Sequence, residues 1–110
     1  MQHVKLNEIV SREVIPGFHG KFVHSKKITS AYWDIMAGYA IPDHTHKQEQ
    51  IMNLIEGEFE LDINGEHLQL YAGAVVVIPS NMHHSGKAIT HCKVIDIFTP
   101  VREDFIFDCI

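Results

Sequence analysis

Residues 58–70 read EFELDINGEHLQL, and this stretch carries the clearest structural signal in the chain. Apolar and polar residues alternate on both sides of a central Asn-Gly, the preferred dipeptide for a two-residue type I′ hairpin turn. Folding the segment about this turn brings apolar residues opposite apolar ones and polar opposite polar, so both faces agree in register. The segment therefore predicts an antiparallel β-hairpin. The pairs expected across it are Leu61 with Leu68, Phe59 with Leu70, Asp62 with His67 and Glu60 with Gln69.

The rest of the chain repeats this pattern of short apolar runs between Gly, Pro and Asn residues. Runs rich in Val and Ile favour strands, and no segment has the periodicity of a long helix. Many short strands separated by turn residues are typical of a sandwich or a closed barrel, and the jelly roll is the small-domain version that protects its sheet edges. We therefore expect one all-β domain over residues 1–110, a jelly-roll β-barrel. Further strands are expected at residues 18–24, 28–36, 50–56, 74–78 and 91–98.

The bulk composition argues against several classes of function. The formal net charge is −5, which repels a phosphate backbone, so nucleic acid is not expected as a partner. No apolar run approaches the roughly 18 residues of a membrane span, and the N-terminal residues lack the apolar core and cleavage site of a secretory signal. We expect a cytoplasmic protein that does not enter a membrane, with Cys92 and Cys109 as reduced thiols.

Nine histidines are the unusual feature of so short a chain. His44 and His46 are two residues apart, and residues i and i+2 of a strand share a face, so both imidazoles can converge on one metal ion. Gln50 is also separated from both histidines by an even number of positions. If the strand continues without a bulge, its amide oxygen lies on that face too, and Met52 and Leu54 follow as apolar lining.

A second segment, from Gly73 to His84, supplies a strand, a sharp turn and another imidazole. Together the two segments resemble the cupin superfamily, whose motifs read G-x5-H-x-H-x3 to 4-E-x6-G and G-x5-P-x-G-x2-H-x3-N. Asn in place of the turn glycine is a tolerable exchange, because Asn also accepts a left-handed backbone. The first motif falls on Gly38, His44, His46, Gln50 and Gly57, with Gln where Glu is usual. The second falls on Gly73, Pro79, Asn81 and His84, with Ala88 where Asn would stand.

The adjacent His83 and His84 of an extended segment point to opposite sides, so only one can face a metal. The cupin spacing selects His84 and leaves His83 to the rim or the solvent side, with a smaller chance of a substrate contact. Three imidazoles and a neutral amide leave a divalent ion with its full charge, which favours an anionic ligand. The expected cofactor is one divalent transition metal, among Ni, Zn, Fe, Mn and Cu. The histidines without a partner at ligand spacing are His3, His19, His24, His67 and His91.

The last expected strand carries a carboxylate on an otherwise apolar face. A carboxylate there is costly to bury unless it is paired, so Asp96 is either a structural hydrogen-bond acceptor or a functional acid or base. Arg102 follows a few residues later, and its simplest interpretation is a surface ion pair with Glu103 or a neighbour. The residues that share the face of Asp96 are Cys92, Val94 and Phe98.

The tail at residues 96–105, DIFTPVREDF, resembles the ending of small cupins from pectin and alginate degradation, the KdgF type. This resemblance implies an enzyme that converts the 4,5-unsaturated monouronate left by polysaccharide lyases to its linear keto form. It also implies that Arg102 binds the carboxylate of this small anionic sugar and that Phe98 forms a wall against the ring. Asp96 would transfer protons, either directly or through metal-bound water.

Two other functions remain open on the sequence. One is a metal-dependent cupin dioxygenase, which Gln50 in place of Glu and the charged pair Asp96 and Arg102 make the weaker interpretation. The other is a non-catalytic cupin that binds a sugar or a metal. A homodimer is also expected, because the outer face of the strand at residues 50–56 is largely apolar. That face is formed by Ile51, Asn53 and Ile55.

Overall fold

The computed structural model describes residues 1–107, and within them the chain forms ten strands and two short 3-10 helices. Both helices are single turns, in agreement with the prediction that no long helix forms. The helices are η1 (Leu6–Glu8) and η2 (Glu103–Phe105). The strands are β1 (Arg12–Ile15), β2 (Phe18–His24), β3 (Thr29–Ile35), β4 (Ala40–His44), β5 (Glu49–Glu56), β6 (Glu58–Ile63), β7 (Glu66–Tyr71), β8 (Val75–Ile78), β9 (His84–Ala88) and β10 (Cys92–Thr99).

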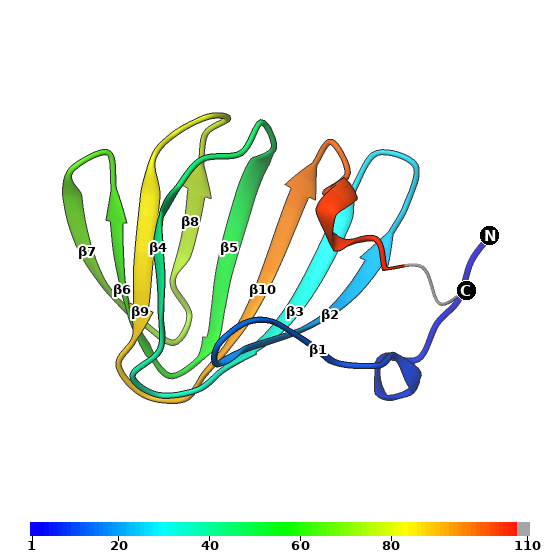
Figure 1. The fold of residues 1–110 in the computed structure, drawn as a ribbon, viewed down its shortest axis with the longest axis horizontal. Coiled ribbons are helices and arrows are strands. Elements are labelled where there is room, and N and C mark those ends of the chain that lie inside the picture. The colour runs from blue at the N-terminus through cyan, green and yellow to red at the C-terminus, as the bar shows by residue number, and fades with distance from the viewer. Residues whose placement is uncertain (108–110) are drawn as a thin grey trace.

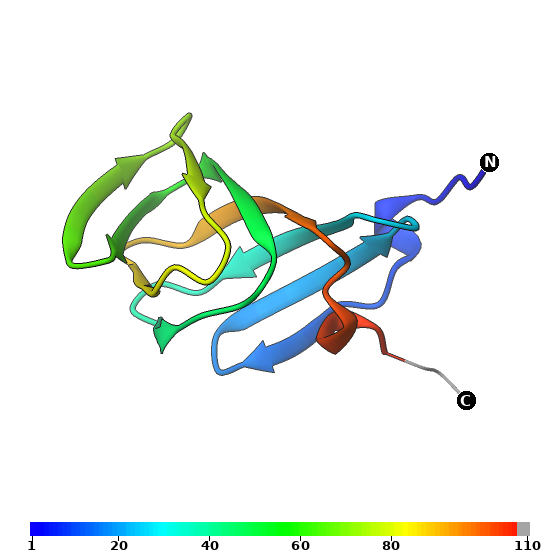
Figure 2. The same ribbon diagram turned by 90° about the horizontal axis from the view of Figure 1, so that it is seen from above.

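The strands form two antiparallel sheets. A six-stranded sheet has the order β1-β2-β3-β10-β5-β8, and a four-stranded sheet has the order β4-β9-β6-β7. Figure 1 shows the strands side by side across the molecule, and Figure 2 shows from above how the two sheets curve around an interior. This is the all-β jelly roll that the sequence predicts. The observed strands begin and end within one or two residues of the six expected ranges that they match, counting the hairpin.

The hairpin formed by β6 and β7 is confirmed in every pair. Leu61 faces Leu68 and Phe59 faces Leu70, as the alternation requires. Asn64 and Gly65 have φ of 48° and 86°, and positive values at both central residues define the type I′ turn. The hairpin therefore folds as its local sequence dictates.

The chain does not continue as one strand from His44 to Gln50, so the condition for placing Gln50 on the strand face of His44 and His46 is not met. β4 ends at His44 in the four-stranded sheet, β5 begins at Glu49 in the six-stranded sheet, and residues 45–48 cross between the sheets as a loop. The turn between β8 and β9 holds this loop, because the Asn81 backbone N–H donates to the His46 carbonyl over 2.9 Å. Asn81 has φ of 61°, the left-handed conformation expected of it. The strands β1, β4 and β9 lie outside the ranges expected for strands, and each is only four or five residues long.

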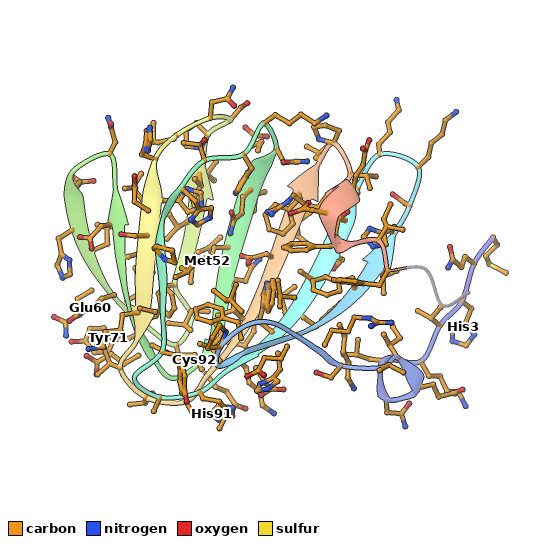
Figure 3. The ribbon with its side chains drawn as sticks, viewed as in Figure 1. His3, Met52, Glu60, Tyr71, His91 and Cys92 are labelled. Atoms are coloured by element: carbon orange, nitrogen blue, oxygen red, sulfur yellow. The ribbon has the colours of Figure 1, made fainter. Side chains whose placement is uncertain are left out.

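The core lies between the sheets and ends in an aromatic cluster. Alternate residues of β10 are buried, as predicted, and Met52 on β5 lies in the middle of the molecule while Tyr71 and His91 lie at its periphery (Figure 3). After β10 the chain folds back over β3 and β2 (Figure 1), where Phe105 stacks on Phe22 with ring centroids 4.6 Å apart. Each large side chain buried in this way stabilises the fold by roughly 1.5–3 kcal/mol.

Two further expectations concern the cysteines and the membrane. Cys92 is a buried free thiol whose Sγ donates to the carbonyls of Glu58 and Thr90, each over 3.2 Å, and burial raises its pKa. Cys109 lies outside the described residues. Within residues 1–107, none of the helices has the length and apolar character needed to cross a bilayer.

Candidate metal centre

Three of the histidines selected from the sequence meet at one end of the barrel. His44 at the end of β4 pairs with His84 at the start of β9, and His46 reaches the same point from the crossing loop. Each offers a ring nitrogen, and these three atoms lie within 4.8 Å of one another. The geometry is that of side chains able to share one ion.

Each imidazole is held in one orientation by a backbone carbonyl. A neutral imidazole carries one N–H, so an Nδ1 that donates to a carbonyl leaves Nε2 with a free lone pair. This arrangement is typical of metal-binding histidines, where the second nitrogen is anchored by an acceptor. The contacts, each 2.9 Å long, are His44 Nδ1 to the Pro42 carbonyl, His46 Nδ1 to the Gln48 carbonyl, and His84 Nδ1 to the Met82 carbonyl.

Burial keeps two of these rings neutral. Burial lowers the pKa of His84 to about 4, and burial followed by the charge of Arg102 lowers the pKa of His46. Neutral imidazole is the form that binds a metal ion. At neutral pH both rings are therefore ready to act as ligands without losing a proton.

Gln50 on β5 completes the cluster from the opposite sheet. Its side chain is 6% exposed, and its Oε1 lies 3.1 Å from His46 Nε2. Neutral His46 thus lies between two oxygen acceptors, the Gln48 carbonyl and Gln50 Oε1, and has one N–H to offer. A metal ion bound to both His46 Nε2 and Gln50 Oε1 would account for their separation, because two ligand atoms about 2.1 Å from an ion and at right angles to each other lie about 3.0 Å apart. The donor set therefore fits a divalent transition metal.

Asp96 is a buried carboxylate on the inner face of β10. It is 7% exposed, and its Oδ1 has no hydrogen-bond partner among residues 1–107. Burial raises the pKa of Asp96 to about 7, against the opposing effects of the Gln50 and Trp33 side chains and of Arg102. A carboxyl group with this pKa can both release and accept a proton near neutral pH.

Arg102 forms an ion pair with a neighbour, as its simplest interpretation predicts, but its own side chain is mostly buried. Its side chain is 12% exposed, and its guanidinium lies over the rings of Phe98 and Phe105 at 4.7 and 4.2 Å. It pairs with Asp104, since Nε donates to Oδ1 over 3.0 Å and Nη2 to Oδ2 over 2.8 Å. Arg102 in turn lowers the pKa of Asp104 through this hydrogen bond. The end of the guanidinium at Nη1 stays available to a ligand.

These groups line one cavity of about 270 Å³. Aliphatic and aromatic side chains such as Trp33, Met52 and Phe98 form most of its wall. The Phe98 ring also meets the His46 ring edge to face, with centroids 5.5 Å apart. A small molecule in the cavity would therefore contact His44, His84 and Asp96. The polar lining consists of His44, Gln50, His84, Asp96, Arg102 and Asp104.

The other histidines lie away from this cluster. His83 points outward and contacts Asp43, with 2.8 Å between Nδ1 and Oδ2. His24 is tied to Thr29 Oγ1 and to the Phe105 carbonyl. Three residues near the centre were not selected from the sequence: Gln48, Asp104 and Trp33. Asp104 pairs with Arg102 two residues away, whereas Gln48 and Trp33 have partners on distant segments that no local spacing predicts.

Comparisons with known proteins support the fold. A family model described as a cupin domain matches residues 31–98. The solved structure of KdgF from Halomonas sp. is 28% identical, covers 91% of this chain and 94% of that chain, and superposes with a TM-score of 0.85. An RmlC-like cupin from Shewanella frigidimarina NCIMB 400 is 24% identical, with coverage of 96% and 97% and a TM-score of 0.89.

A larger protein shares the same architecture. Salicylate 1,2-dioxygenase from Pseudaminobacter salicylatoxidans is 19% identical over 77% of this chain and 27% of that chain, with a TM-score of 0.74. At these identities the likenesses to the RmlC-like cupin and to the dioxygenase concern the fold alone. A comparison with curated proteins found no match.

Proposed function

The chain belongs to the cupin family, and from this premise we propose that it opens the ring of 4,5-unsaturated monouronates from pectin or alginate breakdown, giving linear keto sugar acids. The observation that carries the proposal is Asp96, a buried acid with an unpartnered oxygen in the same cavity as His44 and His84. The matching tail and the likeness to KdgF support the choice of substrate.

In this proposal a divalent transition metal is held by His44, His46, His84 and Gln50. The three lone pairs and the contact between His46 and Gln50 support this ligand set. None of the four ligands is charged, so the ion keeps its full positive charge and attracts an anion. When bound, the metal supplies Lewis-acid polarisation of a substrate oxygen.

Arg102 binds the substrate carboxylate through the part of its guanidinium that Asp104 leaves free. Asp104 occupies Nε and one N–H of Nη2, so the end formed by Nη1 and Nη2 faces the ligand. Stacking on Phe98 and Phe105 fixes the plane of the fork. Phe98 also offers a flat apolar surface to the sugar ring. The substrate is therefore oriented before the chemical step.

Asp96 moves the proton. Opening of the enol ether requires a proton at the alkene carbon, water at the neighbouring carbon, and collapse of the resulting hemiketal. Because the pKa of Asp96 is raised to about 7 by burial, its protonated form is populated at neutral pH and can supply the first proton. Its carboxylate can then take a proton as the hemiketal opens.

We also propose a homodimer formed through the outer face of the six-stranded sheet. Four aliphatic side chains on neighbouring strands are exposed there, and such a face is costly to leave in water. In contrast, the outer face of the four-stranded sheet carries charged residues such as Glu60 and Asp62. A second copy covers these aliphatic side chains, whereas pairing through the outer face of the four-stranded sheet would bring like charges together. The exposed residues are Ile51 (38%), Ile55 (47%), Val75 (61%) and Val77 (58%).

A metal-dependent dioxygenase of an apolar carboxylate is the second candidate. The observation that favours it is the largely apolar wall of the cavity, which suits an aromatic or aliphatic ring better than a sugar hydroxyl. Oxygen uptake separates the two reactions, because ring opening consumes no oxygen. A cupin that binds a sugar or metal without catalysis neither consumes oxygen nor opens the ring.

The proposed function is tested by adding metal-loaded protein to the unsaturated monouronate that a polysaccharide lyase generates. The ultraviolet absorbance of the double bond should fall faster than in buffer alone, and treatment with a chelator should abolish the acceleration. Oxygen uptake should stay at the background rate. A rate equal to that in buffer, with the metal bound, would reject this function.

A further inference from the structure

Gln48 is a buried polar residue in the loop between the two ligand positions His46 and Gln50. It is 5% exposed, and both its backbone amide and its side-chain amide form hydrogen bonds. Its backbone carbonyl accepts the hydrogen bond from His46 Nδ1 over 2.9 Å. Its side-chain Nε2 donates to the carbonyl of Val101 over 3.0 Å, across 53 positions of sequence. One residue therefore touches a proposed metal ligand and the tail.

The tail that begins at Pro100 carries Arg102, and it has other anchors on the six-stranded sheet. The Arg102 backbone N–H donates to Thr29 Oγ1 over 2.9 Å. His24 Nε2 contacts the carbonyl of Phe105 at 3.0 Å. These two contacts hold the tail to β2 and β3. In contrast, the hydrogen bond from Gln48 to Val101 ties the tail to the loop at residues 45–48, which carries the proposed ligand His46.

We propose that Gln48 is a positioning residue that couples occupancy of the metal centre to the placement of Arg102. An ion that binds Nε2 of His46 fixes the ring, and the ring fixes the Gln48 carbonyl through Nδ1. The same residue then holds Val101, which directly precedes Arg102. Because such coupling is reciprocal, a ligand that immobilises Arg102 also strengthens metal binding. This inference rests on the proposed metal centre, and it does not depend on the uronate.

Removing the side-chain amide isolates the coupling. Gln48→Met keeps the length of the side chain and leaves the backbone carbonyl that holds His46, so metal affinity should change by less than about threefold. The Val101 carbonyl loses its donor, and one ordinary hydrogen bond corresponds to about a threefold to tenfold change in the opening equilibrium of the tail.

The test is amide hydrogen exchange of residues 101–105 with and without saturating Ni²⁺ or Zn²⁺, with metal binding measured on the same samples. In the wild type, metal should slow exchange at Arg102 and Phe105. In Gln48→Met this metal-dependent slowing should disappear while metal still binds. Gln48→Glu, which turns a carboxylate toward the Val101 carbonyl, should lose it as well and serves if the Met variant does not fold.

Two variants separate coupling from a general loosening of the tail. Thr29→Val removes the anchor of Arg102 on β3, so exchange should be faster in both states but keep its metal-dependent difference. Gln69→Met, on the outer face of the four-stranded sheet where Gln69 contacts Glu58, should behave as wild type.

In steady-state kinetics Gln48→Met should raise KM and leave kcat within about threefold, since only carboxylate binding is weakened.

Each outcome assigns success or failure. Metal-dependent slowing in Gln48→Met equal to that of wild type would overturn the coupling, as would metal-bound wild type with no slowing. Turnover of the uronate without slowing leaves the proposed function intact and rejects the coupling. Metal-dependent slowing of exchange without turnover of the uronate supports the coupling and rejects the proposed function. A wild type that binds no metal rejects both.

Discussion

His44 and His84 face each other directly across β4 and β9, with ring centroids 4.1 Å apart. Because neighbouring residues of a strand alternate between faces, the residues beside them, Asp43 and His83, point outward and contact each other instead. The same two-residue pairing therefore builds an inner candidate ligand pair and an outer Asp–His pair. Only the inner pair is placed to hold the metal.

Replacement of His84 and His83 should have opposite consequences for metal content. His84→Ala removes a buried ring that is 4% exposed and aimed at the centre, so the metal should be lost. His83→Ala removes an outer ring and should leave the metal in place. Elemental analysis of the purified variants measures both. Equal loss in the two variants would show that the assignment of faces is wrong.

Arg102→Ala should mainly raise KM for the unsaturated uronate. Loss of a charged hydrogen bond costs about 1.5–3 kcal/mol, which corresponds to roughly a tenfold to hundredfold increase in KM. Arg102→Lys keeps the charge but loses the fork, so it should recover only part of the loss. Steady-state kinetics provide the measurement, with Lys87→Ala on the outer face of the four-stranded sheet as control. An unchanged KM would remove Arg102 from the site.

The metal-free protein should show a distinctive dependence of stability on pH. Burial raises the pKa of Asp96 to about 7, so between about pH 4 and 7 the folded state keeps a proton that the unfolded chain has lost. The contribution of Asp96 to stability therefore falls as pH rises through this window. Burial lowers the pKa of His84 to about 4 from 6.5, so the contribution of His84 rises with pH over nearly the same window.

Asp96→Asn removes the first contribution and leaves the second. Relative to wild type, the variant should gain free energy of unfolding as pH rises from about 4 to 7, by on the order of a few kcal/mol. Urea unfolding of chelator-treated proteins across this range measures the difference. A difference that stays constant with pH would mean that Asp96 titrates normally.

The homodimer can be broken at the exposed aliphatic face. Val77→Lys places a charge among the exposed aliphatic side chains and should convert the dimer to a monomer. Gln69→Lys on the outer face of the four-stranded sheet should leave the mass unchanged. Sedimentation velocity at micromolar concentration gives both masses. A wild type that is monomeric at this concentration would contradict the proposed interface.

Local sequence signals predict those parts of the fold that local chemistry determines. The Asn64-Gly65 turn sets the hairpin register, and the alternation along β10 places Asp96 inside, as observed. The spacing of His44, His46 and His84 identifies three side chains that the structure brings together.

Other features depend on contacts between distant segments. His46 was expected on a strand but lies on a loop between the two sheets. The backbone N–H of Asn81 holds this loop by a hydrogen bond to the His46 carbonyl. Gln48 gains its role from Val101 in the tail, and Arg102 is buried by aromatic rings from β10 and η2. Such roles follow from how the tail folds over the barrel, which no spacing within either segment encodes.

The most direct test of the account follows the reaction of the unsaturated monouronate by proton NMR in D₂O, with metal-loaded wild type and Asp96→Asn. Wild type should remove the alkene signal faster than buffer and give the linear keto acid with deuterium at the former alkene carbon. Asp96→Asn should retain its metal yet react slower by roughly two to four orders of magnitude, the range for a general acid–base group. An alkene signal that decays at the same rate with wild type as in buffer would contradict the proposed function, and an Asp96→Asn variant as fast as wild type would contradict the role of Asp96.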